Sequence, residues 1–361
     1  MKKILSVVLA IIMLTVLVSC KKEEYVLKYD DHIMTKPEYS YWFSTIKTQM
    51  VSSYNNGIDS EEFWDTKTED GLTYEEILSD SIHTQISSIL VSCALFDEYG
   101  LEIDEETLAS IDADIQDKED YIGDRIEMNA ELARLGLNVD VLREVYINSA
   151  KVSAVREYLY GKNGTEAVTD DDIAGYFANT YRAAKLIVIY SGIELVTDDD
   201  GNYVYDEEGN VETIELNDEQ KAVKAELITT VKEAIDAGAD IDQCVEEFSE
   251  IDYSEYPNGF FISASDAVSY GSDVVDALWN MEIGETATVS DDVMTFIIYR
   301  DELPDYKDLN TTEKNLVSNI ETIIINELIN KKYKPLIEEI EENEELLSDF
   351  DIRLAHMNSY Y

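Results

Sequence analysis

Ala184-Lys185-Leu186-Ile187-Val188-Ile189-Tyr190 is the first strongly β-type stretch in the chain, and it decides the fold. Runs of β-branched and aliphatic residues of this length are typical of buried strands. Two more such runs follow, Thr286 to Val289 and Met294 to Tyr299. Almost everything else has helical spacing, so the sequence predicts an α-rich α+β fold with one small sheet.

Helical patterns with cap signals surround these strands. Before them, a strand, a turn and a short strand cover Tyr25 to Met34, and Thr35 is the expected N-cap of the next helix. The expected helices are Pro37–Tyr54, Tyr74–Tyr99, Asp104–Leu135, Val139–Tyr160, Ile173–Thr180, Asn217–Ala237, Ile241–Phe248, Ser272–Met281 and Thr311–Lys332. Pro335 interrupts the last of them, and Leu336 to Leu347 is expected to continue as a Glu-rich helix.

The stretch from about 191 to 216 predicts an exposed hairpin inserted before a helix. Two acidic turns, Asp200-Gly201 and Glu208-Gly209, flank Tyr203-Val204-Tyr205. The run Asp198-Asp199-Asp200-Gly201 lacks the spaced carboxylates of a calcium-binding loop. The sequence therefore favours a turn at this position over a metal site.

The N-terminus has the pattern of an export signal. Lys2 and Lys3 precede an apolar run, Ile4 to Val18, which is too short to span a membrane. Leu17-Val18-Ser19-Cys20 resembles a bacterial lipobox. That resemblance implies a signal peptide over 1–19, diacylation of Cys20, a tether over 20–24 and a protein lipid-anchored at the extracytoplasmic face of the cell membrane. An ordinary secreted protein is the alternative.

The composition is extremely acidic. The chain has 361 residues, with 27 Lys+Arg against 78 Asp+Glu, a formal net charge of -51. Nucleic acid is excluded as a partner, because phosphate backbones require clustered cations. The acidic surface either keeps an exported protein soluble or attracts basic client chains and cations.

Reactive side chains are few. Besides Cys20 there are two cysteines, Cys93 and Cys244, both within apolar helices and expected to be buried thiols. The histidines are His32, His83 and His356. No phosphate-binding glycine loop, Cys/His ligand spacing or Ser–His pairing stands out, so we expect no cofactor and no metal.

The order of elements across Arg182 to Asp301 resembles a parvulin domain. Ala183 to Val188 resembles the family's first strand, Ala-Ser-His-Ile-Leu-Val, and Asn258-Gly259-Phe260-Phe261 stands in place of its Gly-Gly-Asp-Leu-Gly segment. Val275 to Glu285 resembles Glu-x-Ala-x-Phe-x-Leu-x-x-Gly-Glu, and Thr295 to Arg300 resembles Tyr-His-Ile-Ile-Lys. With the anchor and the flanking helices, the chain resembles the PrsA-like and SurA-like extracytoplasmic foldases.

The resemblance implies a division of the chain and a function. It implies a helical N-terminal chaperone-like domain over 25–180 and a four-stranded parvulin-like domain over 181–303. The C-terminal helices, over 304–361, are expected to pack on the N-terminal domain. The implied partners are unfolded, exported polypeptides, and a homodimer is left open.

The family's catalytic positions are changed in this chain. Its two histidines correspond to Lys185 and Phe296, and its Cys or Asp to Ile251. Phe296 cannot donate a hydrogen bond to a twisted prolyl amide and Lys185 would bring a charge, so isomerase activity is expected to be weak or lost.

The family's proline pocket maps to Phe260, Tyr270 and Val274, with Phe296 beside them, and peptide binding is expected to be retained. One alternative is an active peptidyl-prolyl isomerase with an altered site. Another is a solute-binding lipoprotein of a transporter, which would require two alternating βαβ lobes.

Overall fold

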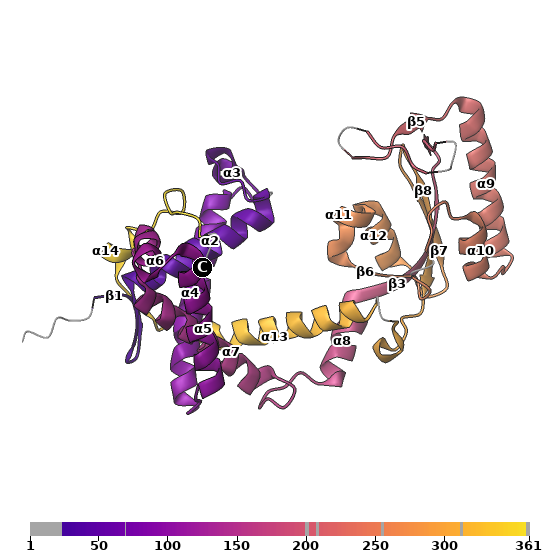
Figure 1. The fold of residues 1–361 in the computed structure, drawn as a ribbon. Helices are drawn as coiled ribbons and strands as arrows, with labels where there is room; N and C mark the ends of the chain where they lie inside the picture. The colour runs from indigo at the N-terminus through magenta and orange to yellow at the C-terminus, as the bar shows by residue number, and fades with distance from the viewer. Residues whose placement is uncertain are drawn as a thin grey trace, which may run out of the picture. The chain divides into compact units, whose positions relative to one another are not determined.

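The computed structural model describes residues 24–68, 70–198, 202–206, 209–253, 256–310 and 313–358 (Figure 1). The predicted signal peptide, 1–19, and Cys20 lie outside these ranges. Contacts divide the chain into two compact units, one with the residues up to 167 and those from 327 onward, the other with 168–326. Among the described residues, no helix has the length and apolarity to cross a membrane.

The first unit is mainly helical, and two of its longer helices begin at threonine capping boxes, of which the sequence predicted the one at Thr35. Thr35 and Thr73 each form a capping box, with Glu38 and Glu76 respectively. The helices are α2 (Lys36–Asn55), α3 (Glu61–Asp65), α4 (Tyr74–Glu98), α5 (Glu105–Ile122), α6 (Arg125–Leu132), η1 (Ala133–Leu135), α7 (Val139–Tyr160), α14 (Glu344–Leu347) and the end of α13 (Lys314–Ile337).

The prediction of one helix from Asp104 to Leu135 is wrong. The helix ends at Gly123, whose φ of 141° is outside the range of a right-handed helix. Asp124 then starts α6 by accepting hydrogen bonds from the backbone amides of Ile126 and Glu127. The acidic, helix-forming residues on both sides of Gly123 concealed this break.

The expected interruption at Pro335 is wrong, because α13 continues through it to Ile337, and the expected helix from Leu336 to Leu347 is wrong at its centre, between Ile337 and Glu344. After α13 ends at Ile337, β9 (Glu341–Glu342) pairs with β1 (Tyr25–Tyr29), and β1 pairs with β2 (His32–Thr35), which gives a sheet of order β2-β1-β9. The Lys28 ammonium lies 3.0 Å from Glu341, and the Asn343 amide donates to the Val26 carbonyl. An available strand edge and an opposite charge outweigh the local helical preference.

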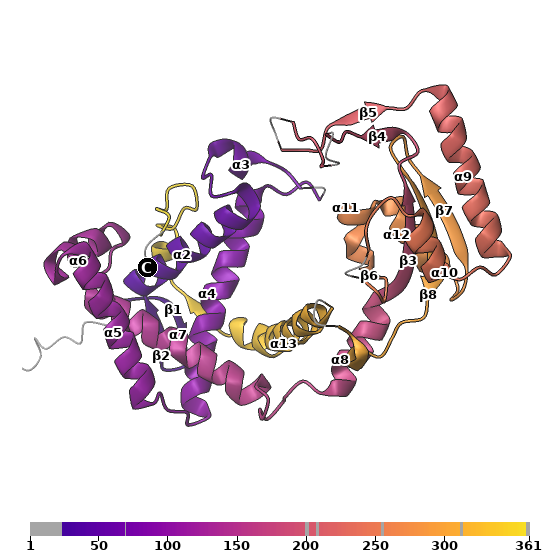
Figure 2. The same ribbon diagram turned by 45° about the vertical axis from the view of Figure 1, so that its right-hand side comes forward.

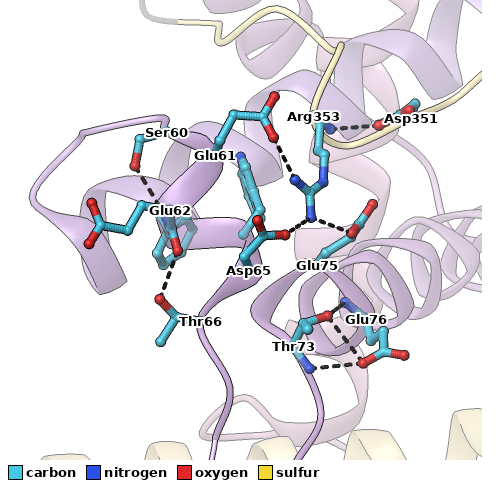
Figure 3. A network of polar contacts seen from close by, with 12 residues as sticks. Ser60, Glu61, Glu62, Asp65, Thr66, Thr73, Glu75, Glu76, Asp351 and Arg353 are labelled. Carbon is cyan, nitrogen blue, oxygen red and sulfur yellow. Dashed lines mark hydrogen bonds and ion pairs between the residues drawn. The ribbon is translucent and has the colours of Figure 1, made fainter.

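Two positively charged side chains, Arg353 and Lys47, connect the C-terminal segment after β9 to the rest of the first unit. The Arg353 guanidinium donates to Glu61, Asp65 and Glu75 at 2.6–2.8 Å (Figure 3). Lys47, which is fully buried, donates to the Ala355 carbonyl at 2.7 Å. These contacts explain why a segment of low helical preference packs with a defined path.

The second unit is built on a four-stranded sheet of order β6-β3-β8-β7, antiparallel throughout. Its strands are β3 (Tyr181–Ile189), β6 (Phe260–Ser263), β7 (Thr286–Ser290) and β8 (Thr295–Asp301). Its helices are α8 (Asp170–Thr180), α9 (Asp218–Asp236), α10 (Ile241–Phe248), η2 (Ala264–Asp266), α11 (Ala267–Tyr270), α12 (Ser272–Asn280), η3 (Tyr306–Asp308) and the start of α13. The predicted α-rich α+β class with a four-stranded sheet is confirmed.

Alternation along β3 separates two cores. Leu186 and Val188 pack with Ile298 and α12 on one face. Ile187 and Ile189 pack with Ile297, α9 and α10 on the other face. The views of Figures 1 and 2 show the two sets of helices on opposite sides of this sheet.

The two units divide the chain at different places from the sequence-based domains. Helix α8, which the sequence assigns to the N-terminal domain, lies in the second unit with residues 304–326. The reason is a small core in which Ile173 and Phe177 of α8 pack against Leu309 and Ile320. The predicted hairpin is present as β4 (Ile193–Leu195) paired with β5 (Thr213–Glu215), ahead of α9.

Candidate functional site

A cleft of about 690 Å³ opens between β3 and the described parts of the segment that joins α10 to β6, residues 249–253 and 256–259. Its side chains come from β3, α10, that joining segment and the start of β6. They are Lys185, Leu186, Asp242, Val245, Glu246, Ser249, Glu250, Ile251, Asp252, Tyr253, Tyr256, Pro257 and Phe260. The cleft is therefore formed within the second unit alone.

Stacked aromatic rings form one wall of this cleft. Phe260 lies at their centre, with its ring centroid 4.7 Å from that of Tyr253 and 4.9 Å from that of Tyr256. Tyr270, which does not line the cleft, has its ring centroid 6.0 Å from that of Phe260. The Tyr256 ring is stacked on Phe260 with an interplanar angle of 30°, whereas the Tyr253 and Tyr270 rings meet Phe260 at 77° and 66°. Such rings offer large apolar faces that lose little conformational entropy when a ligand covers them.

The joining segment keeps its place by bonding to β3 where β6 has ended. The amide of Glu250 donates to the Val188 carbonyl at 2.8 Å, and the amide of Val188 donates to Ser249 Oγ at 3.2 Å. Gly259 has a φ of 79°, and a Cβ there would lie 2.5 Å from the Ala184 carbonyl oxygen. Only glycine allows this close approach without a shift of the backbone.

Lys185 lies at the floor of the cleft with its charge already neutralised. Its side chain is 8% exposed, and Nζ lies 2.7 Å from Asp242 Oδ1 of α10. The same Nζ donates to the Pro257 carbonyl at 2.7 Å. The ammonium therefore fixes the joining segment to β3 and has two of its three protons engaged.

The structure does not bring Lys185 and Phe296 together. Lys185 has the same parity along β3 as Ile187 and contacts α10, so it belongs to the α10 face of the sheet. Phe296 packs with Leu186 and α12 on the other face. The two positions that the resemblance assigns to a catalytic pair are thus separated by the sheet.

The predicted catalytic and pocket positions fall into two groups. Ile251 and Phe260 line the cleft together with Lys185. Tyr270, Val274 and Phe296 pack with Phe260 in the core between the sheet and α12, and they are absent from the cleft lining. Val274 is buried, which indicates a packing role.

Tyr253 and Tyr256 were missed by the sequence interpretation. They flank two residues outside the described ranges, and the signal was available as two tyrosines and a proline in a joining segment directly ahead of Phe260. Burial raises the pKa of the Tyr253 phenol and of the Tyr270 phenol. Both are therefore neutral at physiological pH and act as apolar surfaces or hydrogen-bond donors.

The described side chains give no indication of metal or thiol chemistry. No group of three His, Cys, Asp or Glu residues is arranged to hold a metal ion among them. Cys93 and Cys244 are buried free thiols, as predicted, and burial raises the pKa of Cys93 to about 12. A thiol with so high a pKa is a poor nucleophile.

Comparison with known proteins gives matches among solved structures only. No family model and no curated protein sequence matches the chain. PrsA from Bacillus subtilis is 17% identical, with 81% of this chain and 94% of that chain covered and a TM-score of 0.25. The foldase protein PrsA from Streptococcus pneumoniae is 14% identical, with 80% and 100% covered and a TM-score of 0.23.

A third match is the peptidylprolyl isomerase PrsA from Bacillus anthracis, 14% identical, with 71% of this chain and 96% of that chain covered and a TM-score of 0.25. All three matched structures are PrsA proteins.

Proposed function

We propose that this chain is a membrane-anchored extracytoplasmic folding factor that binds unfolded segments of exported polypeptides in the cleft beside Phe260. The observation that carries the proposal is an open cleft with an aromatic wall on an otherwise acidic unit. Its volume of about 690 Å³ is within the usual range of ligand pockets and accommodates a few side chains of an extended peptide.

The second part of the proposal is that prolyl isomerisation is weak or lost. The reaction needs hydrogen bonds to an amide as it twists out of its plane, and a barrier of roughly 20 kcal/mol has to be lowered. Lys185 is engaged by Asp242 and Pro257, and Phe296 lies across the sheet with no polar atom. The second unit contains no histidine at all.

The location follows from the N-terminal sequence. A lipobox-like Leu-Val-Ser-Cys ahead of a polar tether supports anchoring through two acyl chains on Cys20, which makes membrane attachment stable. Metabolic labelling with a palmitate analogue in a bacterial host tests this directly. We expect label on the wild-type chain and none on Cys20→Ser, and equal label on both would contradict it.

The peptide-binding role is tested with the mature chain and a short fluorescent peptide rich in apolar residues and proline. Tyr256→Ala removes one stacked ring at the mouth of the cleft and should weaken binding roughly 3- to 10-fold, the usual effect of losing an aromatic contact. Tyr121→Ala on α5 is the matched control, because that tyrosine is highly exposed and lies in the first unit. Equal affinities of the two variants would contradict the proposed site.

A further inference from the structure

We propose that the inserted hairpin and α9 form a second groove that continues the cleft and selects client segments carrying positive charge. This inference rests on the proposed function and specifies its substrate class. The occupant is an extended peptide in which Lys or Arg residues alternate with apolar residues.

The second groove is formed by β4, the strands of the hairpin and α9. It has a volume of about 420 Å³, and most of its lining is apolar. The apolar lining residues are Tyr190, Ile193, Leu195, Tyr203, Leu216 and Val223. Tyr203 is 48% exposed and Val223 is 63% exposed, although both lie on polar, acidic elements. Exposed apolar side chains gathered around one groove are typical of an interaction surface.

The two grooves meet at Glu250, which lines both of them. Its position is fixed, because Oε2 accepts a hydrogen bond from the Tyr190 amide at 2.6 Å and its amide donates to the Val188 carbonyl. Its other carboxylate oxygen pairs with Lys224 of α9. A peptide that extends from the aromatic cleft past Glu250 enters the hairpin groove.

The charge of the surroundings determines which peptides are accepted. The segment 191–218 contains ten acidic residues and no Lys or Arg. Those ten are Glu194, Asp198, Asp199, Asp200, Asp206, Glu207, Glu208, Glu212, Glu215 and Asp218. The lysines that line the two grooves, Lys185 and Lys224, are each paired with a carboxylate. A cationic segment is therefore attracted and an acidic one is repelled.

Side-chain alternation suits such a client. In an extended peptide, successive side chains point to opposite sides. Apolar residues of one side contact Val223 and Tyr203, while Lys or Arg residues of the other side face the hairpin carboxylates. A fully apolar peptide gains only the first set of contacts.

The test uses the mature chain and two fluorescent peptides that share their apolar residues and differ only in carrying Lys or Glu at the alternate positions. At low ionic strength we expect the Lys peptide to bind at least about tenfold more tightly than the Glu peptide. The difference should shrink severalfold at high salt, because exposed charges are screened.

A pair of variants locates the effect. Glu194→Lys reverses a charge in the hairpin groove, and Glu105→Lys makes the same change in net charge on exposed α5. We expect Glu194→Lys to weaken the binding of the Lys peptide about tenfold and Glu105→Lys to weaken it less than twofold. Circular dichroism verifies that both variants are folded.

The outcomes separate the two proposals. The inference on charge selection is overturned if the wild type binds the Lys and Glu peptides with equal affinity and Glu194→Lys binds them as Glu105→Lys does. If Tyr256→Ala still weakens the binding of both peptides in that case, the proposed peptide cleft is retained. If neither peptide binds, or if Tyr256→Ala has no effect on either, the proposed function itself is overturned, and the inference with it.

Discussion

Replacing Lys185 by methionine tests how much the contacts of its ammonium group stabilise the second unit. The variant loses the hydrogen bond from Nζ to the Pro257 carbonyl and the ion pair with Asp242. Methionine keeps most of the apolar stem, so little apolar burial is lost. A hydrogen bond from a charged donor contributes about 1.5–3 kcal/mol. The carboxylate left behind is 69% exposed and regains water, so we expect a loss of about 2 kcal/mol in the stability of the second unit.

The reverse change, Asp242→Ala, should cost at least as much. It leaves an ammonium on a side chain that is 8% exposed without its counter-charge. An unpaired charge in a buried position is more costly than an unpaired exposed one, and we expect a loss of about 2–3 kcal/mol. The double variant should lose about 1–2 kcal/mol less than the sum of the two single variants.

Hydrogen exchange followed by mass spectrometry on peptides covering 181–190 measures these changes, because the central strand exchanges through unfolding of its unit. A loss of 2 kcal/mol corresponds to exchange that is about 30-fold faster. Exchange in Lys185→Met within twofold of the wild type would refute the assigned contacts. A double variant that loses the full sum would refute the coupling between the two side chains.

Three further changes probe other parts of the chain. Gly259→Ala places a Cβ 2.5 Å from a backbone oxygen, whereas the Cβ of Gly238→Ala meets nothing within 4 Å. Thermal denaturation should therefore show that Gly259→Ala loses about 2 kcal/mol more stability than Gly238→Ala, and equal losses would contradict this contact. Lys47→Met should lower the stability of the first unit by about 3 kcal/mol and speed hydrogen exchange in residues 352–358, because it removes the hydrogen bond to the Ala355 carbonyl and the ion pair with Asp59. Unchanged exchange in 352–358 would contradict the role of Lys47 in holding that segment. The Arg143 guanidinium lowers the pKa of Asp112, so that pair stabilises the first unit above about pH 4 and is lost as the pH falls through the lowered pKa. Arg143→Gln should therefore flatten the acid side of the melting-temperature profile, and a profile parallel to the wild type would count against the pair.

The elements that the sequence predicted well are those specified by local signals. Thr35 marks the start of α2 through a capping box, and the aliphatic run in β3 identifies the central strand. The break at Gly123 and the strand β9 were missed for different reasons. The first is a single residue in a polar helix, and the second exists only because β1 presents an edge to Glu341 and Glu342.

The candidate site was predicted in part. Lys185, Ile251 and Phe260 line the cleft, whereas Phe296 lies on the opposite face of the sheet. The face of the sheet on which a strand residue lies depends on the partner strand and on the pairing register. Matching residues one by one along a linear sequence specifies neither of them. The aromatic wall was missed because Tyr253 lies in a joining segment without periodicity.

The most direct test of the central claim is proline cis/trans exchange by NMR on a short apolar peptide added to the mature chain labelled at phenylalanine and tyrosine. The account predicts shifted Phe260 and Tyr256 ring signals on peptide addition and an exchange rate equal to that of the free peptide or only slightly above it. Strongly accelerated exchange would show an active isomerase and contradict weak or lost activity, and unchanged ring signals would contradict peptide binding in the cleft.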